Sequence, residues 1–176
     1  MKYLIASDIH GSSYYCEKII EESKKVDFVV LLGDIYYHGP RNPLPEDYNP
    51  MKVSQLLNGI TKKLMVVKGN CDAEVDQIIS DFKIKNNIKK TINSKIVYFT
   101  HGHKYNIDNT PKTNYDIMFY GHFHTPFIKQ YDNKIFVNPG SVSLPKENTE
   151  HSFAIFDNKS IVIKNFNGKI LDKIDL

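Results

Sequence analysis

Side chains that can bind metal ions stand directly after predicted apolar strands at several points along the chain. These segments are Asp8-Ile9-His10, Gly33-Asp34, Gly69-Asn70-Cys71-Asp72, His101-Gly102-His103 and Gly121-His122-Phe123-His124. They contain five of the seven histidines, a clustering that packing alone does not explain. In open α/β sheets, sites form just beyond the carboxyl ends of the strands. The ordered set therefore predicts an α/β protein with a metal centre, which no single segment would predict.

The first half of the chain alternates predicted strands and helices. Apolar runs predict strands over 3–6, 28–32 and 64–67. Spacings of three and four residues predict a helix after each strand. The helical positions are Cys16, Ile19, Ile20 and Ser23; Val53, Leu56, Leu57 and Ile60; and Val75, Ile78, Ile79 and Phe82. We expect a right-handed, mostly parallel unit, with a long loop over 35–50, where four prolines occur without periodicity.

The second half consists of short predicted strands with tight connections. They span 96–99, 117–120, 127–131, 135–137, 153–156, 161–163 and 170–174. Asp132-Asn133, Asp157-Asn158 and Asn167-Gly168 are turn signals between them. No linker separates the two halves. We expect two packed sheets with helices outside, in a single domain covering 1–176.

Composition narrows the classes of protein to consider. The net charge of +3 is small and the lysines are spread along the chain, so we expect no stable nucleic-acid binding. No stretch approaches the roughly 20 apolar residues that span a bilayer, and we expect no membrane association. Cys16 and Cys71 make no disulfide framework. Free thiols without a secretory signal lead us to expect a cytoplasmic protein.

The spacing of the ligands indicates how they converge. Residues two apart in an extended backbone point the same way, so Asp8 and His10 can reach one ion, as can His122 and His124. Asp34 ends a buried strand, where a bare carboxylate needs a cationic partner, and its two oxygens would let it bridge two ions. Imidazole and carboxylate ligands together suit Mn, Fe, Zn, Co or Ni more than Mg or Ca.

Each segment also has a plainer interpretation. Asp8-Ile9-His10 could form a surface turn, Asp34 could cap a helix or turn, and Gly69-Asn70 could be an ordinary turn after a strand. The later histidines could be hydrogen-bonded or exposed loop residues. The metal interpretation depends on the whole ordered set.

In this order, the motifs D-x-H, G-D, G-N-x-D, H-G and G-H-x-H resemble those of the calcineurin-like metallophosphoesterases along nearly the whole chain. Three further stretches resemble the small bacterial YfcE-type phosphodiesterases in particular. They are His38-Gly39-Pro40-Arg41-Asn42, Gly69 to Asp76, and Asn138-Pro139-Gly140-Ser141-Val142-Ser143. The resemblance implies an α/β fold that is a four-layer α/β/β/α sandwich of two mixed sheets flanked by helices.

The resemblance also implies two divalent metal ions per chain. We expect Mn²⁺ first, with Zn, Fe, Ni or Co as alternatives. One ion would be held by Asp8, His10, Asp34 and His124. The other would be held by Asp34, Asn70, His101 and His122. Asp34 would therefore bridge the two ions.

The expected mechanism follows from two ions about 3.5–4 Å apart, which can share a hydroxide between them. We hypothesise that this hydroxide attacks phosphorus in line, with Asp34, Asn70, Asp72 and His122 as the catalytic residues. Asp72 would orient the groups near Asn70. Many members of the family carry histidine where this chain has Cys71, and a thiol with a pKa of about 8.5 is a poor acid at neutral pH.

We therefore expect the protein to act on substrates with good leaving groups, such as an activated aryl diester, and to have weak activity on alkyl monoesters. The candidate substrate contacts are His38, Arg41, Cys71 and His103. Arg41 can grip a phosphate with its fork of donors. The plainer interpretations are an exposed loop for His38 and Arg41, a small space-filling residue for Cys71 and a solvated histidine for His103.

The main prediction is a metal-dependent phosphodiesterase acting on a small phosphodiester. One alternative is a non-catalytic protein-interaction scaffold of the same fold, which would not need His10, His101, His122 and His124. Another is phosphomonoesterase or nuclease activity. Larger nuclease relatives carry additional DNA-binding regions, for which this chain has no room. The oligomeric state, including a homo-oligomer, is left open.

Overall fold

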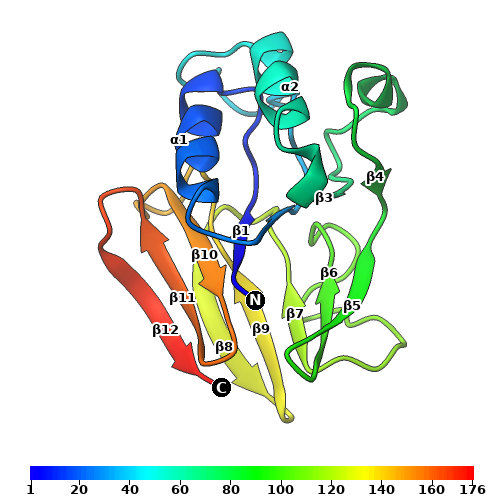
Figure 1. Ribbon diagram of the computed structural model, residues 1–176, viewed down its shortest axis with the longest axis vertical. Helices are drawn as coiled ribbons and strands as arrows, with labels where there is room; N and C mark the ends of the chain where they lie inside the picture. The colour runs from blue at the N-terminus through cyan, green and yellow to red at the C-terminus, as the bar shows by residue number, and fades with distance from the viewer.

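Two mixed β-sheets packed face to face form the centre of the computed structural model, which describes all 176 residues (Figure 1). The seven-stranded sheet has the order β12-β11-β10-β1-β2-β3-β4, and the five-stranded sheet has the order β5-β6-β7-β9-β8. The strands are β1 (Tyr3–Ala6), β2 (Phe28–Leu31), β3 (Leu64–Val67), β4 (Ile84–Lys85), β5 (Ile88–Ile92), β6 (Lys95–Phe99), β7 (Ile117–Phe119), β8 (Phe127–Tyr131), β9 (Lys134–Asn138), β10 (Ser152–Phe156), β11 (Ser160–Asn165) and β12 (Ile170–Asp175). The predicted sandwich of two mixed sheets is confirmed.

The strands of the first half run parallel, as predicted. β1 pairs with β2, β2 with β3, and β3 with β4, all in parallel. In the five-stranded sheet, β7 lies parallel to both β6 and β9. Parallel strands place their carboxyl ends at one edge of a sheet, so the loops that follow them are brought together there.

Two helices cover the outer face of the seven-stranded sheet and lie side by side (Figure 1). α1 (Ser13–Ser23) begins at Ser12, whose hydroxyl accepts a hydrogen bond from the amide of Tyr15. α2 (Pro50–Asn58) begins after Asn49, whose side chain caps it, with proline in the first turn. A single turn of 3-10 helix, η1 (Thr61–Lys63), leads into β3. Between β2 and α2, the predicted long loop has no helix or strand.

The core has layers because alternate strand residues point to opposite faces. In β1, Leu4 and Ala6 pack beneath the helices, while Tyr3 and Ile5 pack between the two sheets. These side chains are all fully buried. This packing fixes the sheets against each other and so fixes the relative positions of the loops at their ends.

The predicted third amphipathic helix over Val75 to Phe82 is wrong. The segment forms a short 3-10 helix, η2 (Glu74–Ile79), and Val75 and Ile78 are 62% and 80% exposed. The side chain of Gln77 donates to the carbonyls of Ser80 and Phe82, which ends the helix. The chain then enters β4, a strand that sequence reasoning missed, together with β5.

The outer face of the five-stranded sheet is covered by the loop over 101–116, which contains no helix. Tyr105, Ile107 and Tyr115 from this loop pack against an aromatic cluster on the sheet. The fourth layer of the sandwich is therefore a loop. At one border the two sheets are joined, because a carboxylate oxygen of Asp172 in β12 accepts from the amide of Ile128 in β8.

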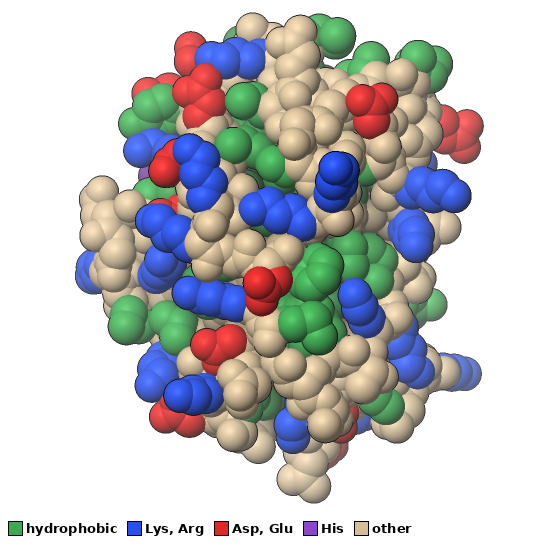
Figure 2. Space-filling view, viewed as in Figure 1, with side chains coloured by type: hydrophobic (Ala, Val, Ile, Leu, Met, Phe, Trp, Pro, Cys, Tyr) green, Lys and Arg blue, Asp and Glu red, His purple; other side chains and the backbone are tan.

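The charged side chains on the face seen in Figure 2 are interspersed with one another and with apolar groups, and they form no single basic patch there. None of the helices has the length and apolar character that crossing a membrane requires.

Candidate metal centre

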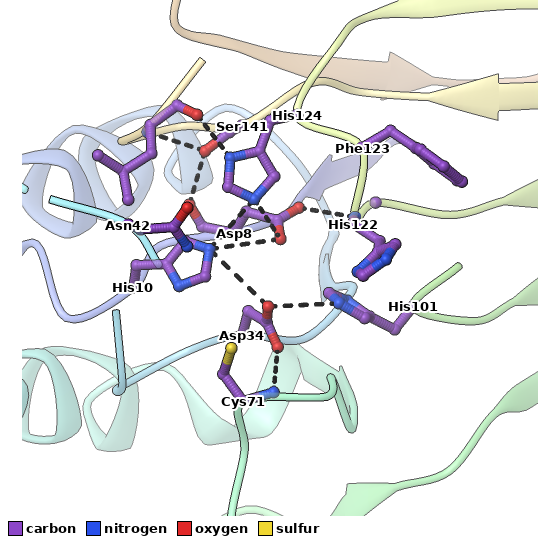
Figure 3. Close-up of polar contacts among 12 residues, drawn as sticks. Asp8, His10, Asp34, Asn42, Cys71, His101, His122, Phe123, His124 and Ser141 are labelled. Atoms are coloured by element: carbon purple, nitrogen blue, oxygen red, sulfur yellow. Dashed lines mark hydrogen bonds and ion pairs between the residues drawn. The ribbon is translucent and has the colours of Figure 1, made fainter. Parts of the chain in front are cut away.

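Five buried side chains converge beyond the carboxyl ends of four strands (Figure 3). Asp8 and His10 follow β1, Asp34 follows β2, His101 follows β6, and His124 lies in the loop after β7. The strand ends brought these residues together in the manner that the sequence pattern predicted.

Carboxylate and imidazole atoms form two overlapping groups at this convergence, and a third group joins His10 and Asp34 to the thiol of Cys71. The ligand atoms of Asp8, His10 and His124 all lie within 4.8 Å of one another, and so do those of Asp8, Asp34 and His101. His124 Nε2 is 3.2 Å from Asp8 Oδ1. His101 Nε2 is 3.4 Å from Asp34 Oδ2, which is also 3.8 Å from His10 Nε2. Asp8 belongs to both groups, and Asp34 Oδ2 lies near a histidine of each.

Backbone carbonyls orient the three buried imidazoles. His10 Nδ1 lies 2.9 Å from the carbonyl of Tyr37, His101 Nδ1 lies 2.7 Å from that of Leu32, and His124 Nδ1 lies 2.5 Å from that of Leu144. A carbonyl can only accept, so each Nδ1 carries the hydrogen. In the neutral form that binds a metal, the rings would therefore turn the lone pairs of all three Nε2 atoms toward the carboxylates, an arrangement common in metal sites.

This orientation leaves acceptors facing one another without a donor. His10 Nε2 and His124 Nε2 are 3.2 Å apart, and the buried Oδ1 of Asp8 has no hydrogen-bond partner. Buried groups of this kind are costly unless a cation lies among them. The donor set of imidazole nitrogens and carboxylate oxygens fits a divalent transition metal, so the residues present suit the metal that the motifs imply.

The charges of the carboxylates and imidazoles are strongly coupled. Burial lowers the pKa of His101, but the carboxylates of Asp34 and Asp8, which would stabilise a second proton at Nε2, outweigh burial and raise that pKa to about 9. Burial raises the pKa of Asp8, but the nearby imidazoles of His10 and His124 hold it well below its usual range. Both pKa shifts show that positive charge is favourable among these side chains. A metal ion can supply that charge instead of protons.

Asn70 and His122 lie on the outer side of the centre. Asn70 Oδ1 is 3.0 Å from His101 Nε2, so two acceptors again face each other. The His122 ring is 5.2 Å from the His101 ring, between centroids, and stands outside the two tight groups. Its backbone amide donates to Asp8 Oδ2 at 3.0 Å. Burial and the charge of His101 lower the pKa of His122 to about 4.

The backbone at the ligands corrects one part of the sequence argument. The side chains of Asp8 and His10, and those of His122 and His124, do not point the same way from an extended strand. These four residues and Asp34 all have positive φ angles, between 51° and 68°. Left-handed backbone is uncommon for residues with a side chain, and it concentrates at functional sites. The ligands therefore converge from tight turns beyond the strand ends.

Asp72 joins the two loops that carry Asp34 and Asn70. It is buried, and its Oδ2 accepts from the amides of Asp34 and Gly69 at 2.8 and 2.7 Å. Its Oδ1 accepts from the amide of Ile35 at 2.7 Å. The loops approach so closely that a side chain at Gly69 would collide with Asp34. Asp72 thus positions the carboxylate of Asp34 without facing the centre itself.

The segment Asn138–Ser143 also supports the centre. The hydroxyls of Ser141 and Ser143 donate to the carbonyl of Asp8 at 2.8 and 2.9 Å. Asn138 Nδ2 donates to the carbonyl of Gly121, next to the histidine loop, at 2.8 Å. The only sequence signal for this role was the resemblance of the segment to family motifs.

A cavity of about 550 Å³ opens beside the ligands. It is lined by Asp34, Tyr37, Gly39, Pro40, Arg41, Asn42, Asn70, Cys71, His122, His124 and Lys146. Two of the predicted substrate contacts, Arg41 and Cys71, are therefore at the cavity. Sequence reasoning missed Tyr37, Asn42 and Lys146, and Lys146 carries no signal that distinguishes it from the other lysines.

The other two predicted substrate contacts, His38 and His103, do not line this cavity, although the His103 ring lies 5.4 Å from the His101 ring and 6.2 Å from the His122 ring, between centroids. The His38 ring packs edge-on against Tyr37 and Tyr48 and does not line this cavity. His103 is exposed and lines a neighbouring cavity of about 500 Å³, which shares Asn70 with the first.

The Cys71 thiol is half-buried at the cavity wall. Burial and the nearby charge of Asp34 raise its pKa to about 12, so it is neutral at physiological pH. Its backbone amide donates to Asp34 Oδ1 at 2.8 Å. This position therefore contributes packing and a backbone donor.

Comparison with known proteins gives consistent matches over most of the chain. The model of the calcineurin-like phosphoesterase superfamily domain matches residues 1–160. The chain is 41% identical over 162 residues to phosphodiesterase YfcE of Escherichia coli, covering 90% of this chain and 88% of YfcE. It is 30% identical over 164 residues to the probable metallophosphoesterase YsnB of Bacillus subtilis, covering 88% and 83%.

Solved structures give the same result. The structure of YfcE, described as a phosphoesterase from E. coli, superposes with a TM-score of 0.95 at 37% identity, covering 99% of this chain and 98% of YfcE. Vps29 of Entamoeba histolytica, complexed with Zn²⁺, superposes with a TM-score of 0.67 at 18% identity, covering 99% of each chain. At that identity the likeness to Vps29 concerns the fold alone.

Proposed function

Because this chain belongs to the calcineurin-like phosphoesterase superfamily, we propose that it is a metal-dependent phosphodiesterase acting on a small phosphodiester. Membership supports hydrolase activity of the phosphoesterase type. The observation that carries the finer proposal is the set of buried acceptors that face one another without a donor, at His10, His124 and Asp8. The identity to a phosphodiesterase supports a diester as substrate.

The proposed centre holds two divalent ions, with Mn²⁺ expected first. One ion would be bound by Asp8, His10, Asp34 and His124. The other would be bound by Asp34, Asn70, His101 and His122. Ions bound there would supply Lewis acidity, which neutralises charge on a phosphoryl group and lowers the pKa of water.

The chain's own residues would determine how that chemistry is used. Asp34 Oδ2 lies near a histidine of each ligand group, so its carboxylate would serve both ions, while Asp72 fixes its loop. With the low pKa caused by burial and by His101, His122 is neutral at pH 7 and suited to be a ligand. Cys71, with its pKa raised to about 12, gives little help to a leaving group. We therefore propose a preference for leaving groups that need no proton.

A screen of metals against substrates tests this function. Protein stripped by a chelator is reloaded with Mn²⁺, Zn²⁺, Co²⁺, Ni²⁺ or Mg²⁺ and assayed on bis(p-nitrophenyl) phosphate and on p-nitrophenyl phosphate. We expect turnover of the diester only after reloading, and a slower rate on the monoester. Absence of metal-dependent turnover of the diester with every metal would contradict the proposal. It would favour a non-catalytic scaffold of the same fold.

A further inference from the structure

Two cationic side chains at the cavity have no partner inside the protein. Arg41 is the only arginine in a chain with 22 lysines, and it lines the cavity beside the ligands together with Lys146. Both are exposed. The ion pairs made by lysine side chains involve Lys24, Lys25, Lys52, Lys164, Lys169 and Lys173. The positive charges of Arg41 and Lys146 are therefore available to a ligand.

The backbone ties Lys146 to the metal centre. Its amide donates to the carbonyl of His124 at 3.3 Å. Leu144, two residues earlier, supplies the carbonyl that accepts from His124 Nδ1. Lys146 is thus anchored through the same segment that orients a proposed metal ligand.

The segment that carries Arg41 is anchored in a similar way. Its loop starts at Tyr37, whose carbonyl lies 2.9 Å from His10 Nδ1, and the loop is closed by Asn42 Nδ2, which donates to the carbonyl of His38 at 2.7 Å. Pro40 and Pro43 bracket the segment and limit its backbone freedom. A restricted loop loses less entropy when it binds a ligand.

The charge balance of the cavity leaves these cations in excess. Asp34 is the only acidic side chain in its lining, and its carboxylate is assigned to the metal ions. No acidic residue of the wall is left to neutralise Arg41 and Lys146. Arginine adds a planar fork of donors that matches a phosphate or carboxylate, which lysine does not offer.

We propose that Arg41 and Lys146 form a binding site for a second anionic group of the substrate, a phosphate or carboxylate on one arm of the diester. The proposal rests on the proposed function, because the metal ions are assigned to the scissile phosphate. It narrows the substrate class to diesters that carry more negative charge than the single charge of the reacting group.

A second pair of cations provides a matched control. Lys68 and Lys104 line the neighbouring cavity, which shares Asn70 with the first. A second anion could lie there instead. Lys104→Gln removes the same charge at a similar exposed position, and so it tests whether binding depends on the particular site or only on overall positive charge.

The experiment measures binding to Mn²⁺-loaded protein by calorimetry, with thymidine 3′,5′-bisphosphate and thymidine 5′-monophosphate as probes. The measured quantity is the ratio of their dissociation constants. In the unaltered protein we expect the bisphosphate to bind about tenfold tighter, as one or two charge-assisted hydrogen bonds allow. Arg41→Gln and Lys146→Gln should each reduce the ratio to about threefold or less, and Arg41→Lys should give an intermediate value. Lys104→Gln should keep the full ratio.

Three results would overturn the site: a ratio near one in the unaltered protein, an unchanged ratio in both Arg41→Gln and Lys146→Gln, or loss of the ratio in Lys104→Gln alone. Because the readout is binding, it is separate from turnover. If the bisphosphate still binds about tenfold tighter than the monophosphate but the diester is not hydrolysed, the result would contradict the proposed function and support the anion site. Diester hydrolysis together with a ratio of dissociation constants near one would support the proposed function and contradict the anion site.

Discussion

The inner and outer sides of the candidate metal centre differ in how firmly the proposed ligands are held. On the inner side, Asp8, His10 and His124 are at most 2% exposed, and carbonyls fix both imidazoles. On the outer side, Asn70 is exposed and His122 is half-buried, with no hydrogen bond to its ring. A catalytic metal site needs rigid ligands and also an open position for substrate. The difference suggests that the inner side supplies the rigidity and the outer side the access.

The largest expected effect comes from removing the residue that joins the two sides. Asp34→Ala should lose both metal ions and lower diester turnover by at least about 1000-fold, equivalent to about 4 kcal/mol of transition-state stabilisation. Elemental analysis and turnover would measure this, with Asp81→Ala at an exposed position as the control. Normal metal content in Asp34→Ala would mean that the two sides do not share a ligand.

The next test compares the sides directly. His10→Ala removes a buried, oriented ligand, so we expect metal affinity to fall by more than about 100-fold, beyond the range typical of outer-shell partners. His122→Ala removes a loosely held ligand and should weaken metal binding less while still lowering turnover. Metal titrations of the two variants give the two affinities. Equal losses would remove the distinction between a rigid and an open side.

Asp72→Asn should act mainly on the outer side. The asparagine keeps the shape, but its amide nitrogen faces backbone amides that need an acceptor. We expect a loss of about 1–3 kcal/mol in the free energy of unfolding and about 10–100-fold weaker metal binding. Urea unfolding and metal titration would show both. Loss of stability with unchanged metal affinity would make Asp72 a purely structural residue.

The smallest effect is expected at Cys71, which lies on the outer side but offers no acid. Cys71→Ser keeps the backbone amide that donates to Asp34, so turnover of bis(p-nitrophenyl) phosphate should change by less than about threefold, or about 0.7 kcal/mol. Steady-state kinetics on the diester measure it. A loss of a hundredfold would assign the thiol a direct part in the reaction.

Sequence patterns predicted the framework of this protein because they encode periodicity and strand ends. The buried strands at 3–6, 28–32 and 64–67 and the residues that follow them were predicted from such patterns. The carbonyls of Tyr37, Leu32 and Leu144 could not be found, since every residue has a carbonyl and only the fold selects those that orient an imidazole.

The features that sequence patterns predicted wrongly or missed also have physical explanations. The spacing of Val75 and Ile78 satisfies a helical pattern, but η2 stops after six residues and leaves both exposed. The loop that covers the outer face of the five-stranded sheet has no periodicity to detect, because its aromatic residues pack individually. The left-handed turns at the proposed ligands depend on segments that are close in space but distant in the sequence.

Those left-handed turns bear on the evolutionary history of the chain. Glycine would occupy the backbone of Asp8, His10, Asp34, His122 and His124 without the penalty of about 1–3 kcal/mol that other residues can incur there. Selection for folding alone would thus favour replacing each of these side chains. A lineage that had given up catalysis would have little reason to resist such replacements, and the presence of all five is what the proposed metal binding would require at some expense of stability.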